Sequence, residues 1–347
     1  MKYGRNLVEL AQELQARAAA KRDLVAPTER LRLDVDGGVA LAVESDASYS
    51  LTRHTHRQIA GWAGVPTAYY ERMLAEAPHL LASNINHWLT ETPARRLVRT
   101  LGGTARAFLS DRYRRLDNED VAEAALPVLL ESDDIQVVSA EVTDSKLYLK
   151  AVFPRVVDEV RQGDVVQAGV VISNSEIGLG SLSVVPLVYR LVCLNGMIAA
   201  DAAWRKYHVG RLIDASDDLS VYRDETIAAD DRALMMKLQD VVRAASGDAF
   251  RAVVERMREA TEGPVVQSPV KAVEVLGRTV GLRGAEKDSV LERLIRGQDY
   301  SRYGVMNAVT NLANDAPDYD RATELEALGG RVLTLGADQW RQVAEAA

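Results

Sequence analysis

The spacing of apolar and polar residues predicts a helical beginning for this chain. Residues 5–21 carry apolar side chains at helical spacing and predict one amphipathic helix. Apolar and polar positions alternate on both sides of Asp36-Gly37, which predicts a β-hairpin over residues 31–43. Residues 51–77 predict two short helices separated at 64–66 (Gly-Val-Pro), because proline cannot continue the first helix and suits the start of the second.

The middle of the chain is rich in β-branched residues and predicts an antiparallel sheet. The segments RLVRTL and TARAFL flank Gly102-Gly103 and predict a hairpin with a two-residue turn. Two further hairpins are predicted over residues 135–154 and 164–198, and Asn118 can cap a helix between the first hairpin and these two. We interpret residues 91–200 as one mainly antiparallel sheet with a helix packed on it.

The helical period returns from about residue 217, with a stop at Gly263-Pro264 and a restart at Ser268-Pro269. The predicted fold class is therefore α+β, with a central, mainly antiparallel β-sheet of long hairpins and packed helices, flanked by helical N- and C-terminal regions. We expect three parts: an N-terminal helix, hairpin and helix pair over 1–90, a sheet domain with a basic hairpin over 91–215, and a helical region over 216–347.

Composition points to a cytoplasmic location. The single cysteine, Cys193, leaves no possible disulfide framework within one chain, which fits a reducing compartment. The N-terminal residues are charged throughout and show no signal-peptide core. No apolar run approaches the roughly 20 residues that span a bilayer, so we expect no membrane partner.

Enzyme signatures are sparse. The chain has no GxxxxGK[ST], HExxH, CxxC or GxSxG motif. His54 and His56 could ligate a metal, but the absence of a nearby cysteine or a second suitable pair favours polar residues at a helix start. The glycine pair at 178 and 180 lies in a strand-rich stretch with no helix after it, so a hairpin tip is favoured over a dinucleotide site. We therefore expect no catalytic residue, cofactor or metal, although an enzymatic activity stays open.

Arginine is concentrated in residues 95–115, which hold seven arginines and one acid, Asp111, in a chain of formal net charge −8. A simple hairpin around the glycine turn would place Arg99 directly opposite Arg106, near Phe108. Like charges so placed destabilise a sheet unless something neutralises them. Two interpretations stay open: the arginines grip the phosphates of a polyanion beside a base-stacking ring, or they form salt bridges within the protein or with a neighbouring subunit.

A smaller basic and aromatic cluster lies within residues 203–211. The candidate nucleic-acid-binding residues of the two clusters are Arg95, Arg96, Arg99, Arg106, Phe108, Arg112, Tyr113, Arg114, Arg115, Arg205, Lys206 and Tyr207. Residues 57–74 also resemble a DNA-reading helix-turn-helix that would present Thr67, Tyr69, Tyr70 and Arg72. Any helix pair with a glycine turn looks alike, so a structural helix pair is favoured there.

Three long segments carry a family resemblance: VRTLGGTARAFLSDRYRRLDNED, GVVISNSEIGLGSLSVVPLVYRLVCLNGMI and GVMNAVTNLANDAPDYDRATELEALGG. They resemble phage and plasmid proteins grouped under a domain of unknown function, number nine-three-two, over about residues 50–330. The resemblance implies a phage, prophage or plasmid context. It supplies no catalytic residues, so function must be argued from the site itself.

Mobile elements often carry their own recombination and single-strand-handling proteins, and a hairpin sheet with basic residues is similar in outline to single-strand annealing proteins. We therefore expect single-stranded nucleic-acid binding, with single-stranded DNA favoured, for annealing or recombination. Sheet edges that need covering lead us to expect a homo-oligomer. The first alternative is a non-enzymatic interaction or regulatory protein that uses the arginines for subunit or partner contacts. The second is an unrecognised nucleotide-processing enzyme.

Overall fold

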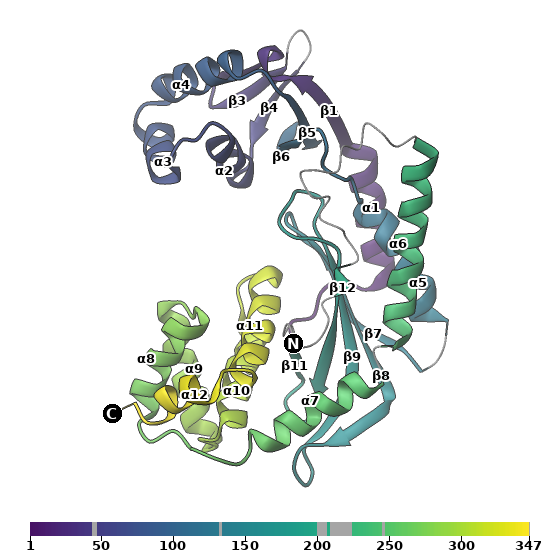
Figure 1. Ribbon diagram of the computed structural model, residues 1–347, viewed down its shortest axis with the longest axis vertical. Helices are drawn as coiled ribbons and strands as arrows, with labels where there is room; N and C mark the ends of the chain where they lie inside the picture. The colour runs from purple at the N-terminus through teal and green to yellow at the C-terminus, as the bar shows by residue number, and fades with distance from the viewer. Residues whose placement is uncertain (44–46, 132–133, 200–206, 209–223, 245–246, 347) are drawn as a thin grey trace. The chain divides into compact units, whose positions relative to one another are not determined.

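The computed structural model (Figure 1) contains two β-sheets, each of six strands within the described chain, and helices packed around both, which confirms the α+β class. It describes residues 1–43, 47–131, 134–199, 207–208, 224–244 and 247–346. The chain forms two compact units. The small unit comprises residues 11–119 and 175–179, and the large unit comprises residues 1–10, 120–174 and 180–347.

The sheet of the small unit has the strand order β1-β5-β6-β4-β3-β2. Neighbouring strands are antiparallel except β4 and β6, which pair in parallel. The β2–β3 hairpin confirms the prediction made from the alternating pattern around Asp36-Gly37. The strands are β1 (Lys21–Pro27), β2 (Leu31–Asp34), β3 (Ala40–Val43), β4 (Ala47–Leu51), β5 (Arg95–Leu101) and β6 (Thr104–Ser110).

Helices cover this sheet, with α2 packed against β6 and α4 against β2 (Figure 1). The predicted helix break is confirmed: Gly64 adopts a positive φ of 67° and α3 begins directly after Pro66. The core includes Leu33, Ile59, Leu81 and Phe108. The helices are α1 (Leu7–Ala20), which runs from the large unit into the small one, α2 (Arg53–Trp62), α3 (Thr67–Glu76) and α4 (Pro78–Glu91), the last of which the sequence analysis missed.

The sheet of the large unit has the order β11-β10-β9-β8-β7, and β12 pairs with β10. All of these pairs are antiparallel, which confirms the two predicted hairpins over 135–154 and 164–198. The strands are β7 (Gln136–Val142), β8 (Leu147–Glu159), β9 (Val165–Asn174), β10 (Ser183–Arg190), β11 (Asn195–Ile198) and β12 (Tyr207–His208).

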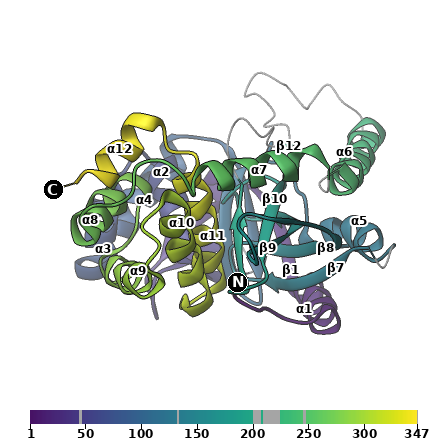
Figure 2. The ribbon, with the colours of Figure 1, turned by 90° about the horizontal axis from the view of Figure 1, so that it is seen from below.

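The predicted helical C-terminal region is confirmed. Its last five helices gather together (Figure 2). Helices α10 and α11 contact β11. The helices are α5 (Asn118–Leu130), which begins in the small unit, α6 (Asp224–Ala244), α7 (Asp248–Glu259), α8 (Pro269–Val280), α9 (Gly284–Gly297), α10 (Arg302–Asn311), α11 (Tyr319–Leu333) and α12 (Ala337–Ala344). Among the described helices, none is both long and apolar enough to cross a membrane.

The interpretation of residues 91–200 as one sheet is wrong. Strand β5 hydrogen-bonds along its whole length to β1, and β6 pairs with β4, so the arginine hairpin completes the small unit's sheet. The strands from β7 onward form the other sheet. The two compact units consequently divide the chain at other places than the predicted parts 1–90, 91–215 and 216–347.

Candidate functional site

The β5–β6 hairpin carries most of the candidate arginines, and its register differs from the predicted one. The pairing beside the Gly102-Gly103 turn is as expected, but a β-bulge follows it. Arg99 lies opposite Ala107, and Arg106 is the extra residue of the bulge. A bulge sets two residues of one strand against one of the other. The predicted direct opposition of Arg99 and Arg106 is therefore wrong.

Arg99 is fully buried and held by acids of the small unit. Its Nε donates to Asp23 Oδ1 at 3.0 Å, and its Nη2 pairs with Asp117. The third nitrogen, Nη1, donates to the backbone carbonyl of Glu176 at 3.0 Å. Asp23 lies directly opposite Arg99 in the β1–β5 register, so strand pairing itself places this carboxylate beside the guanidinium. All three guanidinium nitrogens therefore have partners inside the unit.

Arg106 meets the same acidic segment from the neighbouring strand. Its Nη2 lies 3.0 Å from Glu176 Oε2, and both side chains are buried. The other carboxylate oxygen, Oε1, accepts from Lys21 Nζ at 3.2 Å and from the backbone N–H of Asn118, at the start of α5, at 2.8 Å. Asn118 thus serves the site through its backbone. Three donors from three elements converge on one carboxylate.

The electrostatics of this cluster favour the charged forms. Burial alone would raise the pKa of Glu176, but the Asn118 N–H bond and the charges of Lys21 and Arg106 lower that pKa below its usual value. Burial likewise opposes ionisation of Asp117, yet Arg99 and Lys21 lower its pKa. Burial tends to lower the pKa of Arg99, whereas Asp117 and Asp23 raise it overall. The cluster is a network of mutually stabilised ions at neutral pH.

The Glu176 backbone belongs to a short segment, residues 175–179, that is fastened to the small unit on both sides of the carboxylate. The carbonyl of Ile177 accepts from His54 Nε2 at 2.8 Å and from Gln58 Nε2 at 3.0 Å. The carbonyl of Ser175 accepts from the Tyr113 hydroxyl at 3.1 Å. The structure thus assigns Arg99 and Arg106 to internal ion pairs, the second of the two interpretations drawn from the sequence.

A different group of candidates lies at the open end of the hairpin, where Arg96 forms the last strand pair with Ser110. The Arg96 guanidinium lies 5.5 Å from the Trp62 ring centroid and 5.4 Å from that of Phe108. In the described chain no ion-pair partner reaches it, and its Nε is buried without a hydrogen bond. Burial lowers the pKa of Arg96, and nearby Asp111 only partly opposes that shift.

Two exposed arginines lie near Arg96 in the sequence of the hairpin. Arg95 directly precedes Arg96, and Arg112 comes two residues after Ser110, so both lie at the open end. Within the described ranges, neither guanidinium has an ion-pair partner. Phe108 is buried beneath Arg96 and offers its ring to the core rather than to a ligand. The structure therefore leaves Arg95, Arg96 and Arg112 at the open end without ion-pair partners among the described residues. As consecutive strand residues, Arg95 and Arg96 face opposite sides of the sheet, and Arg96 packs against Trp62, which was not among the candidates.

The other candidates do not join this group. Tyr113 is half-buried with its hydroxyl bonded to the backbone, Arg115 lies 3.8 Å from Asp23, and Arg114 has an interaction of its own within the protein. Arg205 and Lys206 lie outside the described residues, and Tyr207, in β12, pairs with Val184 of β10.

The helix pair α2–α3 gives little support to metal binding. His54 donates to a backbone carbonyl, and His56 Nδ1 lies 2.9 Å from the hydroxyl of Tyr70. The described residues hold no group of three or more potential metal ligands.

The same helix pair was compared with a DNA-reading helix-turn-helix. Of the side chains that such a motif would present to DNA, Tyr70 is buried, whereas Tyr69 is exposed.

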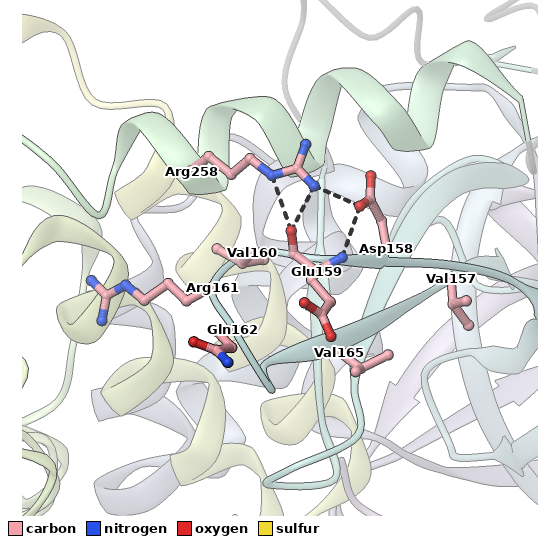
Figure 3. Close-up of a pocket in the computed structure, with 8 residues that line it drawn as sticks. All are labelled: Val157, Asp158, Glu159, Val160, Arg161, Gln162, Val165 and Arg258. Atoms are coloured by element: carbon pink, nitrogen blue, oxygen red, sulfur yellow. Dashed lines mark hydrogen bonds and ion pairs between the residues drawn. The ribbon is translucent and has the colours of Figure 1, made fainter.

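The large unit has a shallow depression at the β8–β9 turn (Figure 3). Arg258 reaches over it from α7 and donates through Nε to the carbonyl of Glu159 at 3.0 Å and through Nη2 to Asp158 Oδ1 at 2.5 Å. These contacts hold α7 against β8, and they already occupy the Arg258 guanidinium and the Asp158 carboxylate. We interpret the depression as structural.

Comparison with protein families matches residues 107–317 to a domain of unknown function, DUF932. The curated proteins contain no match to this chain, and neither do the solved structures. The matched residues begin inside β6 and include Arg112 and Glu176, whereas Arg95, Arg96 and Arg99 precede them. They span more than half of the chain, and the chain therefore belongs to the family defined by this domain of unknown function.

Proposed function

We propose that this protein binds single-stranded nucleic acid, with single-stranded DNA as the favoured ligand, through the open end of the β5–β6 hairpin. The observation that carries the proposal is the half-buried Arg96 guanidinium, which packs against the Trp62 and Phe108 rings and has no carboxylate partner in the described chain. A guanidinium held in this way keeps its charge available to an anion. Guanidinium planes and aromatic rings are also the surfaces on which splayed bases stack.

The exposed arginines at this end of the hairpin carry the charge needed to bind the phosphate backbone of a nucleic-acid strand. Arg95 and Arg112 are exposed and can each contact a phosphate, and Trp62 is half-buried beside Arg96. The two units differ in charge: the small unit has 15 Lys and Arg against 14 Asp and Glu, and the large unit has 27 against 36. Repulsion from the acidic large unit would confine a polyanion to the small one. Annealing or recombination for a phage or plasmid is the biological role we propose for this binding.

Titration of a fluorescent single-stranded oligonucleotide at several salt concentrations tests the proposal. Three arginine contacts predict a slope of log K against log salt of about −2, since each neutralised phosphate contributes about −0.7 on single strands. Binding that is absent at low salt, or that ignores salt, contradicts the proposal. An equal affinity for an acidic peptide of the same charge would favour the alternative of a protein partner.

Paired variants locate the contact surface. Arg112→Gln and Arg95→Gln should each weaken binding by about tenfold and reduce the salt slope by about 0.7. The matched control is Arg32→Gln, because Arg32 is 67% exposed on β2 of the same unit but lies away from the hairpin. An equal loss in all three variants would mean that total charge, and not the open end of the hairpin, determines binding.

A further inference from the structure

A second candidate site lies between α2 and α3 of the small unit and is not used by the proposed function. It is a cavity of about 290 Å³ lined by residues of both helices. Leu74 and the half-buried His56 supply accessible surface, buried Ala60 and Tyr70 lie beneath it, and Arg53 and Arg57 are among the polar lining residues. The volume is at the lower end of the range for small-molecule sites. A compact ring compound would fit, and a large cofactor would not.

The charges at the cavity are unequal. Arg53 Nη2 lies 3.2 Å from Glu71 Oε1, and Arg57 Nη2 lies 3.5 Å from the same oxygen. Glu71 is the acidic partner that the described residues provide for both guanidiniums. One carboxylate neutralises only one of two arginines, so one positive charge remains at the cavity. These side chains are also exposed enough to meet a ligand from solvent.

The rest of the lining is uncharged. His56 Nδ1 and the Tyr70 hydroxyl are hydrogen-bonded at 2.9 Å, and their rings contact edge to face. Burial lowers the pKa of His56 and raises the pKa of Tyr70, so both rings are neutral near pH 7. The cavity therefore combines an uncharged lining with one unneutralised guanidinium charge.

We propose that this cavity binds a small organic anion with a single negative charge. Its carboxylate or phosphodiester group would contact Arg53 and Arg57, and a body the size of one ring would pack on Leu74 and the half-buried His56. A monoanion neutralises the charge that Glu71 leaves over, and charge-assisted hydrogen bonds to guanidinium are strong and directional. The proposal does not rest on nucleic-acid binding at the hairpin.

Saturation-transfer NMR and calorimetric titrations of the full chain test the proposal with two monoanionic one-ring probes, benzoate and methyl phenyl phosphate. Their neutral counterparts are benzamide and dimethyl phenyl phosphate. At least one anion should bind saturably and about tenfold more tightly than its neutral counterpart. Preference for benzoate would identify a carboxylate ligand, and preference for methyl phenyl phosphate a phosphodiester. Binding of neither anion, or equal binding of anion and neutral counterpart, overturns the proposal.

Variants give effects of opposite sign. Arg53→Gln and Arg57→Gln should each weaken anion binding at least about fivefold, whereas Glu71→Gln should tighten it, because the competing carboxylate is gone. Arg72→Gln is the matched control, since Arg72 is 70% exposed on α3 and pairs with Glu76 away from the cavity. Weaker binding in Glu71→Gln, or an equal loss in the control, contradicts the proposal. Arg112→Gln should leave anion binding unchanged, which separates this site from the hairpin.

Discussion

Glu176 shows how one residue can bind two arginines, one through its side chain and one through its backbone. Its carboxylate accepts from Arg106, Lys21 and the first N–H of α5, and its carbonyl accepts from Arg99. It is also the only Asp or Glu between residues 165 and 199, which is the one sequence signal that could have marked it. A lone acid at the tip of an apolar hairpin is a candidate partner for a cationic cluster elsewhere in the chain. Two of the clustered arginines, Arg99 and Arg106, therefore have a structural role, which is to bind Glu176.

Removing a charge from this network should destabilise the protein. Arg99→Gln leaves Asp23 and Asp117 without their shared buried cation, and breaking a buried pair in this way costs about 3–5 kcal/mol. Urea unfolding followed by circular dichroism measures the loss. The control is Arg72→Gln, whose exposed i,i+4 pair should contribute about 0.5 kcal/mol or less. Unchanged stability in Arg99→Gln, together with weaker oligonucleotide binding, would return Arg99 to the nucleic-acid interface.

The same network predicts a loss of stability in acid. The pKa of Glu176 is lowered from 4.5 and that of Asp117 from 3.8, so the folded state binds protons less readily than the unfolded state. The stability that these two carboxylates contribute is fully present above their unfolded-state pKa values. It is lost as the pH falls through their lower, folded-state pKa values. Urea midpoints measured between about pH 7 and pH 3 should fall most steeply below the unfolded pKa values. Glu176→Gln should flatten that decline, and an identical pH profile in the variant would contradict the role given to Glu176.

At the scale of elements, a different constraint appears where helix α11 meets strand β11 in the large unit. A Cβ atom added to Gly330 would lie 2.1 Å from the backbone carbonyl oxygen of Ile198, so only glycine permits this approach. Gly330→Ala should therefore push α11 from the strand and lower the free energy of unfolding by about 1–3 kcal/mol. Thermal or urea unfolding measures the change.

Gly297→Ala is the matched control for that substitution. Gly297 is the last residue of α9, and nothing lies within 4 Å of its added Cβ. Alanine is a better helix former than glycine, so this variant should be neutral or stabilised by up to about 1 kcal/mol. Equal losses in both variants would mean that helix termini in general, rather than the α11–β11 approach, are sensitive.

Local elements could be predicted from the sequence because their signals lie within a few residues. The hairpin at Asp36-Gly37 and the helix break at Pro66 depend only on turn chemistry and backbone geometry. The partner of β5 could not be predicted in this way, since the β1 residues that pair with it lie 68 to 80 positions earlier, and neither could the bulge that displaces Arg106. Of the candidate site, the concentration of arginine was visible. The acids that Arg99 and Arg106 meet, Asp23 and Glu176, lie 76 and 70 residues away along the chain.

At the scale of the whole molecule, the strand orders bear on self-association. Strand β2 ends the small unit's sheet and β7 ends that of the large unit. In the described chain, β7 is met on its outer side by a single bridge between Ala140 and Arg5. Unpaired strand edges favour pairing with another chain unless they are short or protected by charges. The acidic large unit also offers a complementary charge to Arg95 and Arg112, which have no ion-pair partner among the described residues.

We therefore predict that the protein self-associates. Light scattering coupled to size-exclusion chromatography at micromolar concentration should give a mass that is a multiple of the 38.0 kDa chain. If charge complementarity contributes, higher salt and the Arg95→Gln and Arg112→Gln variants should shift the distribution toward the monomer, because exposed ion pairs are screened. If edge pairing dominates, those changes should have little effect. A proline placed in β7 at Val142, whose N–H bonds the Glu141 side chain rather than β8, should instead yield the monomer with an unchanged circular-dichroism spectrum, since proline removes a backbone donor from the strand edge. A 38.0 kDa species under all of these conditions would contradict self-association and, with it, any ring or filament on a nucleic-acid strand.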